Sequence, residues 1–471
     1  MEKIEKFFKL KENNTDVKTE IIAGITTFFT MAYIIFVNPD ILSQTGMDFN
    51  SVMIATCISA TIGTLLIGLM SNYPFAQAPG MGLNAFFTFS VVFGLGYTWQ
   101  QALAAVFISG IVFLLITISG IRQTVVEAIP LSLKNAISAG IGFFIAFVGF
   151  NNAGIIHVNQ GPIIDIINAT DKLDKGAMIG AVNNAGSQVL EFGNFADPAV
   201  LLAVIGLVIT GILMVKQVKG ALFIGILATT IIGIPMGVTN LDVDFSMKSI
   251  TLKETFMKMD FAGLVSGKGG VLNSIISVVT VVLSFFIVDM FDTMGTLIGT
   301  ANKAGFLDKD GNLPRGNKAM LADAIATCAG AVLGTSTVTT FVESSAGVSE
   351  GGRTGLTSVV VSILFLLAIF LAPVAGIIPG AATAPALIIV GVLMMSSLKN
   401  INFDDFEEAL PAFVTMVLMP YSYSIANGIA AGFIFYAIVK LVKGKAKEVH
   451  PVMYIFVGLF ILRYLLLTLF M

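Results

Sequence analysis

Two carboxylates, Asp289 and Asp292, lie within an apolar run at residues 281–301 that is long enough to cross a lipid bilayer. A charged side chain at the bilayer centre costs about 2.5 to 3.5 kcal/mol on insertion scales, so such residues normally face a cavity or a partner and mark a path for substrate or protons. Because the two aspartates are three positions apart, they share one face of a helix. The run therefore predicts a functional cavity inside a membrane-spanning segment.

The composition of the whole chain is that of a membrane protein. Of its 471 residues, 56% are hydrophobic and 12% are charged, whereas about 25% are charged in ordinary soluble domains. Its 47 glycines and 14 prolines are typical of closely packed and locally broken transmembrane helices. The two cysteines, Cys57 and Cys328, both fall in apolar runs, so neither a disulfide framework nor a metal site is expected. We therefore expect an all-α polytopic membrane protein without a cofactor, and the net charge of -3 gives no indication of a nucleic-acid partner.

Apolar segments that are long enough to cross the membrane, in whole or in part, recur along the chain. Fourteen can be marked, at residues 21–41, 51–70, 75–93, 100–120, 134–150, 198–215, 220–238, 273–298, 319–335, 337–351, 354–373, 382–398, 409–420 and 423–442. The lysine-rich segment 1–20 shows no cleavable signal peptide and is expected in the cytoplasm by the positive-inside rule. The short connections that would then lie outside carry no Lys or Arg, whereas the inner connections carry several. We therefore expect an even number of crossings with both ends inside.

Three parts of the chain are harder to place in this topology. Two long connections, 151–197 and 239–270, would lie outside and hold several lysines, which the positive-inside rule tolerates in long loops. The final run, 451–471, is apolar but contains Arg463. It is compatible with a fifteenth span, with an interfacial helix, or with a helix packed beside the bundle, and the sequence leaves these alternatives open.

A short internal repeat relates the two halves of the chain. The tetrapeptide Ile-Ala-Thr-Cys occurs at residues 54–57 and again at 325–328, each time in the second span of its half and before a glycine-interrupted segment. Seven spans separate the equivalent elements, and an odd number inverts the second half relative to the first. Inverted repeats with interrupted helices in corresponding positions are the best sequence indication of a transporter's midplane site.

The interrupted segments are the third and the tenth. In the third, Pro79 and Gly80 stand within an apolar run, where proline removes a backbone hydrogen bond and glycine favours other conformations. In the tenth, serines and glycines surround Glu343. Non-helical backbone at membrane depth is tolerated only against protein or a wet cavity. Both breaks therefore predict a cavity.

We expect this cavity to contain Asp289 and Glu343 first, and Asp292 and Asn84 second. Carboxylates accept hydrogen bonds from ring and exocyclic N–H groups, and the Asn84 amide offers a donor and an acceptor, as a purine edge requires. Two alternatives stay open, because Asn84 could cap the break and Asp292 could hold a neighbouring helix through hydroxyl groups. Asp323, near the start of the ninth span, is expected to be structural. Since both histidines lie in connections, a proton path through the membrane would have to use carboxylates.

The chain resembles one known family in three stretches: QAPGMGLNAFF at 77–87, VDMFDTMGTLIG at 288–299 and ESSAGVSEGGRTGLTS at 343–358. They are similar to the AzgA-like branch of the nucleobase/ascorbate transporter superfamily, the hypoxanthine, guanine and adenine permeases, and the likeness extends over about residues 17–455. It implies two inverted seven-span repeats that form a core domain and a gate domain, an elevator-like motion and a homodimer. The implied boundaries are 21–120 and 273–373 for the core and 134–238 and 382–442 for the gate, with 443–471 as a C-terminal segment.

The resemblance also implies a purine site between spans 3, 8 and 10. It matches Asp289 to the essential acid of span 8, Asp292 to its acidic neighbour, and Glu343 to the acid that opens the span 10 motif. Gly82 and Asn84 match the glycine and asparagine of the span 3 motif. We expect Asp289 to contact the purine and Asp292 to hold or gate the helix, with proton coupling among Asp289, Asp292 and Glu343.

These features predict a proton-coupled importer of purine nucleobases in the cell membrane, for hypoxanthine and guanine, with adenine as a further candidate. The nearest alternative is a carrier of uracil, xanthine or a small anion on the same architecture. An anion site would favour Arg or unopposed helix N-termini at the breaks, whereas Glu343 adds negative charge there. An enzyme is not expected, since the chain has two histidines and no HExxH motif for hydrolytic chemistry. A channel would differ by flux without saturation or dependence on a proton gradient.

Overall fold

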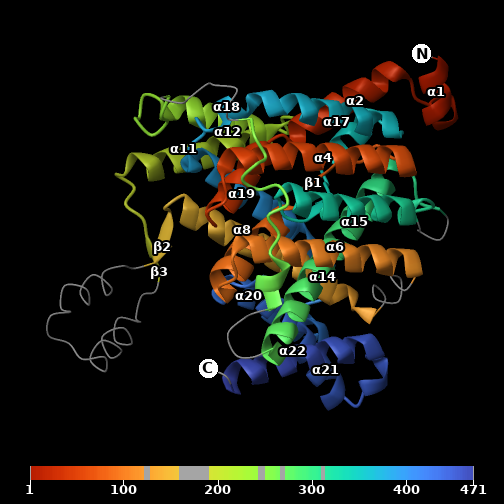
Figure 1. The fold of residues 1–471 in the computed structure, drawn as a ribbon, viewed down its shortest axis with the longest axis vertical. Coiled ribbons are helices and arrows are strands. Elements are labelled where there is room, and N and C mark those ends of the chain that lie inside the picture. The colour runs from red at the N-terminus through yellow and green to blue at the C-terminus, as the bar shows by residue number, and fades with distance from the viewer. Residues whose placement is uncertain are drawn as a thin grey trace.

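The computed structural model describes residues 2–120, 128–158, 190–241, 250–265, 271–308 and 313–469, and its regular structure is almost entirely helical (Figure 1). Parts of the two long connections expected outside the membrane fall beyond these ranges. Among the described helices, eight are long and apolar enough to cross a membrane, and four shorter apolar helices accompany them. The molecule is therefore a multi-pass membrane protein.

The order of elements matches the order of the predicted spans. The first half contains α1 (Glu2–Phe8), η1 (Lys11–Asn13), α2 (Val17–Met31), α3 (Ile34–Ser43), α4 (Phe49–Ser71), β1 (Gln77–Pro79), α5 (Met81–Ala85), η2 (Phe86–Gly94), α6 (Trp99–Ser119), α8 (Leu131–Asn152), β2 (Ile156–Val158), β3 (Leu190–Phe192), α11 (Pro198–Val215) and α12 (Ala221–Gly233). The second half contains α13 (Phe261–Val265), α14 (Val271–Ala304), α15 (Gly316–Leu333), β4 (Val338–Thr340), α16 (Ser344–Ser349), α17 (Gly355–Ala368), η4 (Ile369–Leu371), α18 (Ala372–Ala375), α19 (Gly380–Met394), η5 (Met395–Asn400), α20 (Phe406–Tyr421), α21 (Ile425–Val442), η6 (Ala446–Glu448) and α22 (Pro451–Leu469). Each predicted span coincides with helix, and the third and tenth begin with a short strand.

Polar side chains begin several helices where the chain re-enters the bundle. The Asp48 carboxylate accepts a hydrogen bond from the Ser51 N–H at 2.7 Å at the start of α4. At the start of α6, Thr98 and Gln101 form a capping box. These caps satisfy backbone donors that a helix cannot pair internally and that lipid cannot solvate.

The two interrupted spans meet each other at their breaks, as the sequence predicts. Strand β1 pairs with β4 in antiparallel register, with Gln77 opposite Thr340 and Pro79 opposite Val338. Further backbone bonds extend the pairing on both sides, from Gly80 N to Thr337 O and from Phe341 N to Ala76 O. Each strand leads into a short helix, α5 or α16. The two breaks therefore satisfy each other's backbone groups, which makes non-helical chain acceptable at membrane depth.

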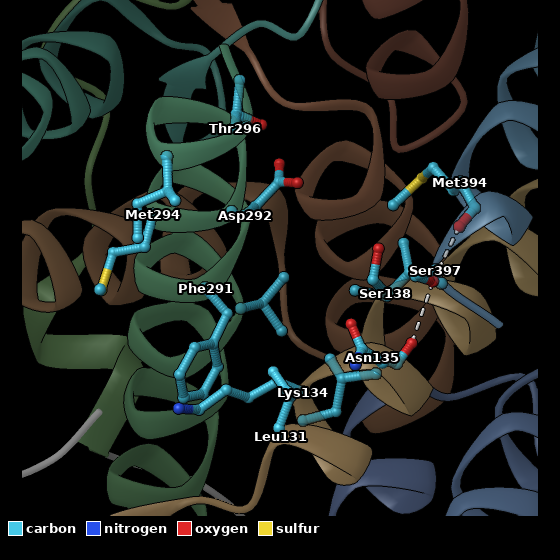
Figure 2. A pocket seen from close by; sticks show the side chains of 16 residues that line it. Leu131, Lys134, Asn135, Ser138, Phe291, Asp292, Met294, Thr296, Met394 and Ser397 are labelled. Carbon is cyan, nitrogen blue, oxygen red and sulfur yellow. Dashed lines mark hydrogen bonds between the residues drawn. The ribbon is translucent and has the colours of Figure 1, made fainter. Parts of the chain in front are cut away.

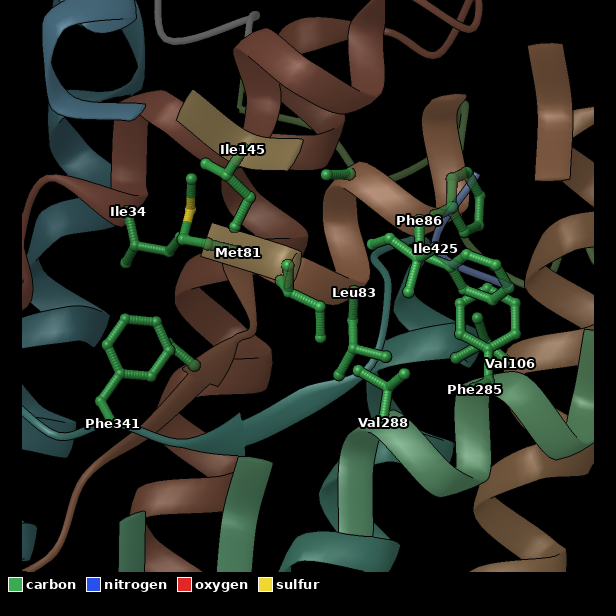
Figure 3. Packing of buried hydrophobic residues seen from close by; sticks show 14 of the residues in the cluster. Ile34, Met81, Leu83, Phe86, Val106, Ile145, Phe285, Val288, Phe341 and Ile425 are labelled. Atoms are coloured by element: carbon green, nitrogen blue, oxygen red, sulfur yellow. The ribbon is translucent and has the colours of Figure 1, made fainter. Parts of the chain in front are cut away.

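The helices pack in two groups. The first helix group contains α2 to α6 and α14 to α17, and α4 lies against α15, α17 and α3. The second helix group contains α8, α11, α12 and α19 to α21, and α8 lies against α19 and α20. Apolar side chains of the broken third span, including Met81, Leu83 and Phe86, pack among residues from both groups, such as Ile145 and Phe285 (Figure 3). The breaks thus lie where the two groups meet.

Helix α22 resolves the alternatives left open for the C-terminal run. It packs against α21 and α14. Near its start the Tyr454 hydroxyl donates to Ala446 O, just beyond α21, and further along the Tyr464 hydroxyl donates to the Asn427 side chain at the start of α21. The helix therefore runs back along α21 as a further pass, and the two chain ends lie at opposite ends of the bundle (Figure 1). The expectation of an even number of crossings with both ends on the same side is therefore wrong, because α22 adds one more pass after α21. Arg463 is 3% exposed within this packing rather than on a membrane surface.

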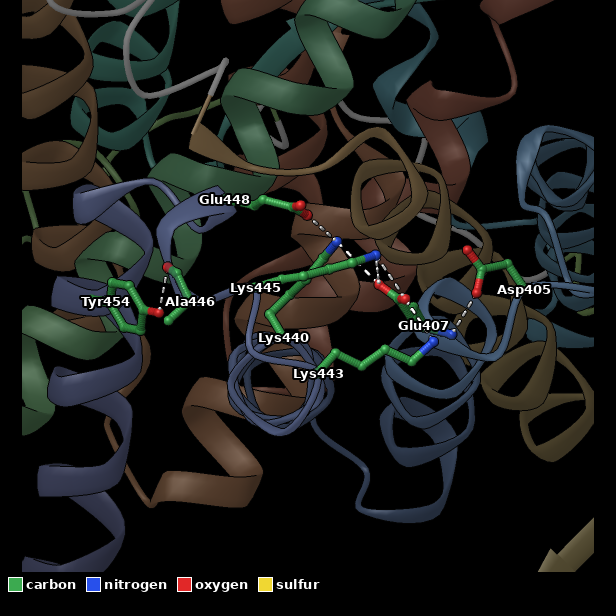
Figure 4. A network of polar contacts seen from close by, with 8 residues as sticks. All are labelled: Asp405, Glu407, Lys440, Lys443, Lys445, Ala446, Glu448 and Tyr454. Atoms are coloured by element: carbon green, nitrogen blue, oxygen red, sulfur yellow. Dashed lines mark hydrogen bonds and ion pairs between the residues drawn. The ribbon is translucent and has the colours of Figure 1, made fainter.

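Ion pairs join the start of α20 to the end of α21 (Figure 4). The Glu407 carboxylate lies 2.8 Å from Lys443 Nζ, 3.0 Å from Lys445 Nζ and 3.2 Å from Lys440 Nζ, and Lys440 also pairs with Glu448. Glu407 precedes the apolar part of α20, and hydrogen bonds from Lys443 and Lys445 lower the pKa of its carboxyl group to about 2. The three lysines therefore fix one end of this helix pair.

Candidate functional site

A cavity of about 480 Å³ lies between the two helix groups. Its walls come from residues within 131–141 of α8, from residues within 288–299 of α14, and from Met394 and Ser397 at the end of α19 and in η5 (Figure 2). This size is typical of sites for small molecules, which range over about 300 to 1,000 Å³. Asp292 is the acidic residue among its lining residues. We call this space the main cavity.

A smaller hollow of about 80 Å³ adjoins the main cavity and reaches the two breaks. Asp292, Thr296 and Met394 line both spaces. The smaller hollow, here called the side pocket, is also lined by Tyr33, residues 80–82, residues 339–343 and Val390. The side pocket therefore brings Asp292 and Glu343, from spans 8 and 10, to one place.

Hydroxyl groups hold both of these carboxylates. The Tyr33 hydroxyl donates to Glu343 Oε1 at 2.9 Å, and the Thr339 hydroxyl donates to Asp292 Oδ2 at 3.4 Å. A carboxylate has two oxygens and can accept several hydrogen bonds. Each acid therefore keeps acceptor capacity for a ligand.

The break in span 3 approaches the second helix group so closely that it requires glycine. A Cβ atom on Gly82 would lie 2.6 Å from Ile141 Cγ2 on α8, and a Cβ atom on Gly80 would lie 2.9 Å from Thr339 Oγ1. Both distances are too short for a normal contact. Gly82 therefore lines the side pocket with backbone, at the contact between the two helix groups.

Asp289 and Asn84 do not line either space. Asp289 is fully buried, and its Oδ2 accepts a hydrogen bond from the Thr327 hydroxyl at 3.2 Å. Asn84 is also fully buried, and its Oδ1 accepts a hydrogen bond from the Ser336 hydroxyl. Of the residues singled out from the sequence, the structure thus brings Asp292, Glu343 and Gly82 to the side pocket and places Asp289 and Asn84 behind it.

The buried carboxylate of Asp323 connects the segments around the pocket. From the sequence, Asp323 was expected to be only structural. Asp323 Oδ1, on α15, accepts hydrogen bonds from Gln77 Nε2 at 2.8 Å and from the Thr293 hydroxyl at 2.9 Å. Gln77 Nε2 also donates to the Thr340 hydroxyl at 3.2 Å, and Thr340 N lies 3.5 Å from the Thr293 hydroxyl. We call these four residues the Asp323 cluster. It joins β1, β4 and α14, which carry the residues that line the side pocket.

A sequence signal for this cluster exists in the spacing of aspartates and threonines. On α14, Asp289 precedes Thr293 by four positions, and on α15, Asp323 precedes Thr327 by four positions. In the structure each aspartate accepts from the threonine of the other helix. The same Asp-x-x-x-Thr spacing on two successive helices could therefore have predicted their reciprocal pairing, since residues four apart share a helix face.

A pattern that resembles a serine-hydrolase motif also has a structural explanation. Residues 347–351 read Gly-Val-Ser-Glu-Gly, which fits the G-x-S-x-G pattern. Ser349 lies in α16, where its hydroxyl donates to Ser345 O at 2.8 Å, rather than on a strand-to-helix turn. His157 lies in β2 and pairs with Glu191 of β3. The serine therefore lacks the context of a nucleophile.

Comparison with known proteins identifies the family. The profile described as Permease family matches residues 18–173 and 167–431. The chain is 46% identical to a protein of Methanocaldococcus jannaschii that is named as a permease, over 99% of both chains. It is 43% identical to the guanine/hypoxanthine permease PbuO of Bacillus subtilis, over 98% of this chain and 100% of the relative. It is 42% identical to the adenine permease AdeP of Escherichia coli, over 98% of this chain and 95% of the relative.

Solved structures with the same fold belong to more distant transporters. The transmembrane domain of the cyanobacterial bicarbonate transporter BicA superposes with a TM-score of 0.61 at 16% identity, over 87% of this chain and 97% of that domain. At this identity the likeness establishes the fold alone, which is that of about fourteen spans in two inverted seven-span repeats. With its interrupted spans 3 and 10, the pocket at their breaks and its closely similar relatives, the chain is a transporter rather than an enzyme, and it belongs to the permease family, within the purine branch of the nucleobase/ascorbate transporter superfamily.

Proposed function

We propose that this protein is a purine nucleobase importer of the cell membrane that carries its substrate together with a proton. The observation that supports this most directly is the side pocket, where Asp292 and Glu343 meet at two interrupted spans. Both carboxylates can accept hydrogen bonds from the N–H groups of a neutral purine. Relatives that cover nearly the whole chain are named as guanine/hypoxanthine and adenine permeases.

The pocket offers a flat ring both polar and aromatic contacts. Phe341 lines it, and its ring lies 6.5 Å from that of Tyr33, centroid to centroid. Aromatic side chains bury large apolar area and favour stacked or edge-to-face contacts. A purine would place its N–H groups toward Asp292 and Glu343 and its faces near these rings.

The geometry reassigns two roles within span 8. We propose that Asp292, which lines the pocket, contacts the substrate. Asp289 lies behind the wall, and we propose that it supports the α14–α15 contact and takes part in proton coupling. Asn84 and Gly82 shape the break in span 3. The transported proton would reside on the carboxylates of this region, because the described spans contain no histidine.

Transport is proposed to follow an elevator-like motion of one helix group against the other. We propose that the first helix group acts as the core domain and the second as the gate domain; the position of the main cavity between them supports this. We further propose a cytoplasmic N-terminus, which the lysines of residues 1–20 support, and a homodimer, which the family resemblance supports.

A carrier of uracil, xanthine or a small anion is the second candidate, since BicA shares the fold. The two carboxylates of the side pocket disfavour an anion by like-charge repulsion. Competition by unlabelled uracil, xanthine and bicarbonate against labelled hypoxanthine separates these substrates. Uptake of labelled uracil, xanthine or bicarbonate, without uptake of hypoxanthine, guanine or adenine, would support this second candidate.

The central test is uptake of labelled hypoxanthine, guanine and adenine by cells that lack their own purine permeases. We expect saturable uptake that an uncoupler abolishes. Asp292→Asn and Glu343→Gln should each reduce uptake at least about a hundredfold, because each removes a charged acceptor from a buried site. Asp48→Asn, at the N-terminal cap of α4 and outside the lining of both spaces, is the matched control and should retain uptake. Normal uptake in both pocket variants, at equal surface expression, would refute the site.

A further inference from the structure

The wall of the main cavity opposite Asp292 carries polar side chains that the proposed site does not yet use. Apolar residues of α8 and Met394 make up half of this wall, and α8 also places Lys134, Asn135 and Ser138 on the cavity. Ser397 follows from η5. In Figure 2 Asn135 and Ser138 lie across the cavity from Asp292. In pockets of this kind, a few polar groups among apolar walls usually determine specificity.

These polar groups differ in how far their hydrogen-bonding capacity is already used. The Ser397 hydroxyl donates to Asn135 O at 3.1 Å and to Met394 O at 3.0 Å. The Lys134 ammonium lies 5.6 Å from the centroid of the Phe291 ring. The Asn135 amide has one long contact, 3.5 Å to Asn400 O.

Ser138 stands apart from these residues. Within the described chain its hydroxyl has no hydrogen-bond partner, although serine in a helix commonly bonds to the carbonyl four residues earlier. Its side chain is half-buried and lines the cavity. A half-buried hydroxyl without a protein partner is available to a ligand in this cavity, as donor or as acceptor.

We propose that Ser138 and Asn135 contact the edge of the purine that faces away from Asp292, and that they set which purine is accepted. This inference rests on the proposed function. The carboxylates can satisfy only the N–H groups of a purine, yet each purine also carries ring nitrogens and, in hypoxanthine and guanine, a carbonyl that require donors. On the opposite wall, the Ser138 hydroxyl and the Asn135 amide, whose one contact is the long one to Asn400 O, can supply such donors.

The chemistry of the substituent at C6 makes this edge suitable for discrimination. Adenine carries an amino group there, which donates, whereas hypoxanthine and guanine carry a carbonyl, which accepts. A site that hydrogen-bonds one such group rejects an analogue that lacks it, because its own polar group is left unpaired. An amide and a hydroxyl on α8 can therefore decide between 6-amino and 6-oxo purines.

The experiment measures inhibition constants of unlabelled adenine and hypoxanthine against uptake of the labelled substrate. In Asn135→Asp, which replaces the amide donor by an acceptor, we expect the ratio of the two constants to shift about tenfold in favour of adenine. In Ser138→Ala we expect the ratio to change about tenfold, at a surface expression equal to that of the wild type. Ser397→Ala is the matched control, since its hydroxyl lines the same cavity but is already bonded to two carbonyls, and its ratio should stay within about twofold.

The outcomes separate this inference from the function on which it rests. If the wild-type protein takes up purines and the ratio stays within about twofold in both Ser138→Ala and Asn135→Asp, the inference is refuted while the function stands. If the wild type takes up no purine, both are refuted. A shift in Ser397→Ala as large as in Ser138→Ala would also refute the inference, because it would trace the change to the general shape of the wall.

Discussion

At the scale of single residues, hydroxyl groups rather than cations partner the carboxylates at and behind the side pocket. Each of these four acids accepts a hydrogen bond from a threonine or tyrosine, and within the described part of the chain none of them forms an ion pair; they are Asp289, Asp292, Asp323 and Glu343. Neutral donors bind a carboxylate less strongly than a Lys or Arg does. A proton or a substrate N–H group can therefore compete for these acids, which an internal salt bridge would prevent.

The Asp323 cluster provides a prediction at this scale. Asp323→Ala should lower the ratio of maximal rate to KM for purine uptake about ten- to hundredfold, because it disconnects β1, β4 and α14 behind the pocket. Asp323→Asn keeps an oxygen acceptor for Gln77 and Thr293 and should retain more activity than the alanine variant. Asp197→Ala, at the start of α11, is the control for loss of a carboxylate far from the pocket. Equal, wild-type uptake in all three variants would show that the cluster does not position the site.

At the scale of elements, the close approach of α5 to α8 links the broken span to the second helix group. The contact is made by the Gly82 backbone against the Ile141 side chain, and β1 holds α5 in place through its pairing with β4. Helices α5 and α8 leave no room for a Cβ atom at Gly82. This position therefore needs glycine because glycine has no side chain, and not because glycine is flexible. Helices α5 and α8 therefore contact each other here through steric fit, whereas the polar contacts lie at the pocket.

Gly82→Ala is expected to reduce purine uptake about tenfold or more, because the new Cβ atom would lie 2.6 Å from Ile141 Cγ2 and must displace α5 or α8. The double variant Gly82→Ala with Ile141→Ala should recover part of this loss, since it removes the clashing atoms. Gly211→Ala on α11, where a Cβ atom meets open space, is the control and should leave uptake unchanged. Failure of the double variant to recover any uptake, at normal expression, would argue against a steric cause.

The ion pairs between α20 and α21 predict a pH dependence of stability. The folded pKa of Glu407, about 2, lies below its ordinary value of 4.5. The ionised carboxylate therefore stabilises the fold above about pH 4.5, and this contribution is lost as the pH falls from 4.5 through 2. Glu407→Gln should lower the thermal midpoint in detergent by a constant amount at neutral pH. The difference from the wild type should shrink below pH 4.5, and Glu12→Gln, in an exposed pair at the N-terminal segment, should show no comparable difference.

At the scale of the whole molecule, the two helix groups enclose a cavity on one side of the breaks and pack closely on the other. The main cavity lies along residues 131–141 of α8, whereas the second part of α8 contributes Phe144 and Phe147 to an aromatic cluster with Phe89 and Tyr423. Phe89 belongs to the first helix group and the other three rings to the second. Close by, the Ser90 hydroxyl accepts the Ile425 N–H at 3.2 Å. The structure is thus open on one side of the pocket and closed by packed rings on the other.

This asymmetry predicts that the contact between η2 and α21 must separate during transport. A disulfide between Ser90→Cys and Ile425→Cys should hold the closed side shut and abolish uptake, and reduction should restore it. Each single cysteine variant should transport normally under the same oxidising conditions. The two native cysteines do not interfere, because Cys57 is buried and Cys328 is only partly accessible. Unchanged uptake in the cross-linked protein would mean that this contact is not part of the moving surface.

The sequence by itself determined the architecture, because hydrophobic length and the position of helix-breaking residues are local properties. It placed fourteen spans, located the breaks at Pro79 and around Glu343, and indicated an inverted repeat, all of which the fold confirms. The sequence could not assign the roles of the two aspartates on span 8. Residues three apart share a helix face, so the pattern could not tell which of Asp289 and Asp292 reaches the pocket and which bonds to α15. That choice depends on how α14 is rotated against α15 and β4, which is fixed by the reciprocal bonds of Asp323 and Thr327. Long-range side-chain packing of this kind appears only in the tertiary structure, as do the polar wall on α8 and the course of α22 along α21.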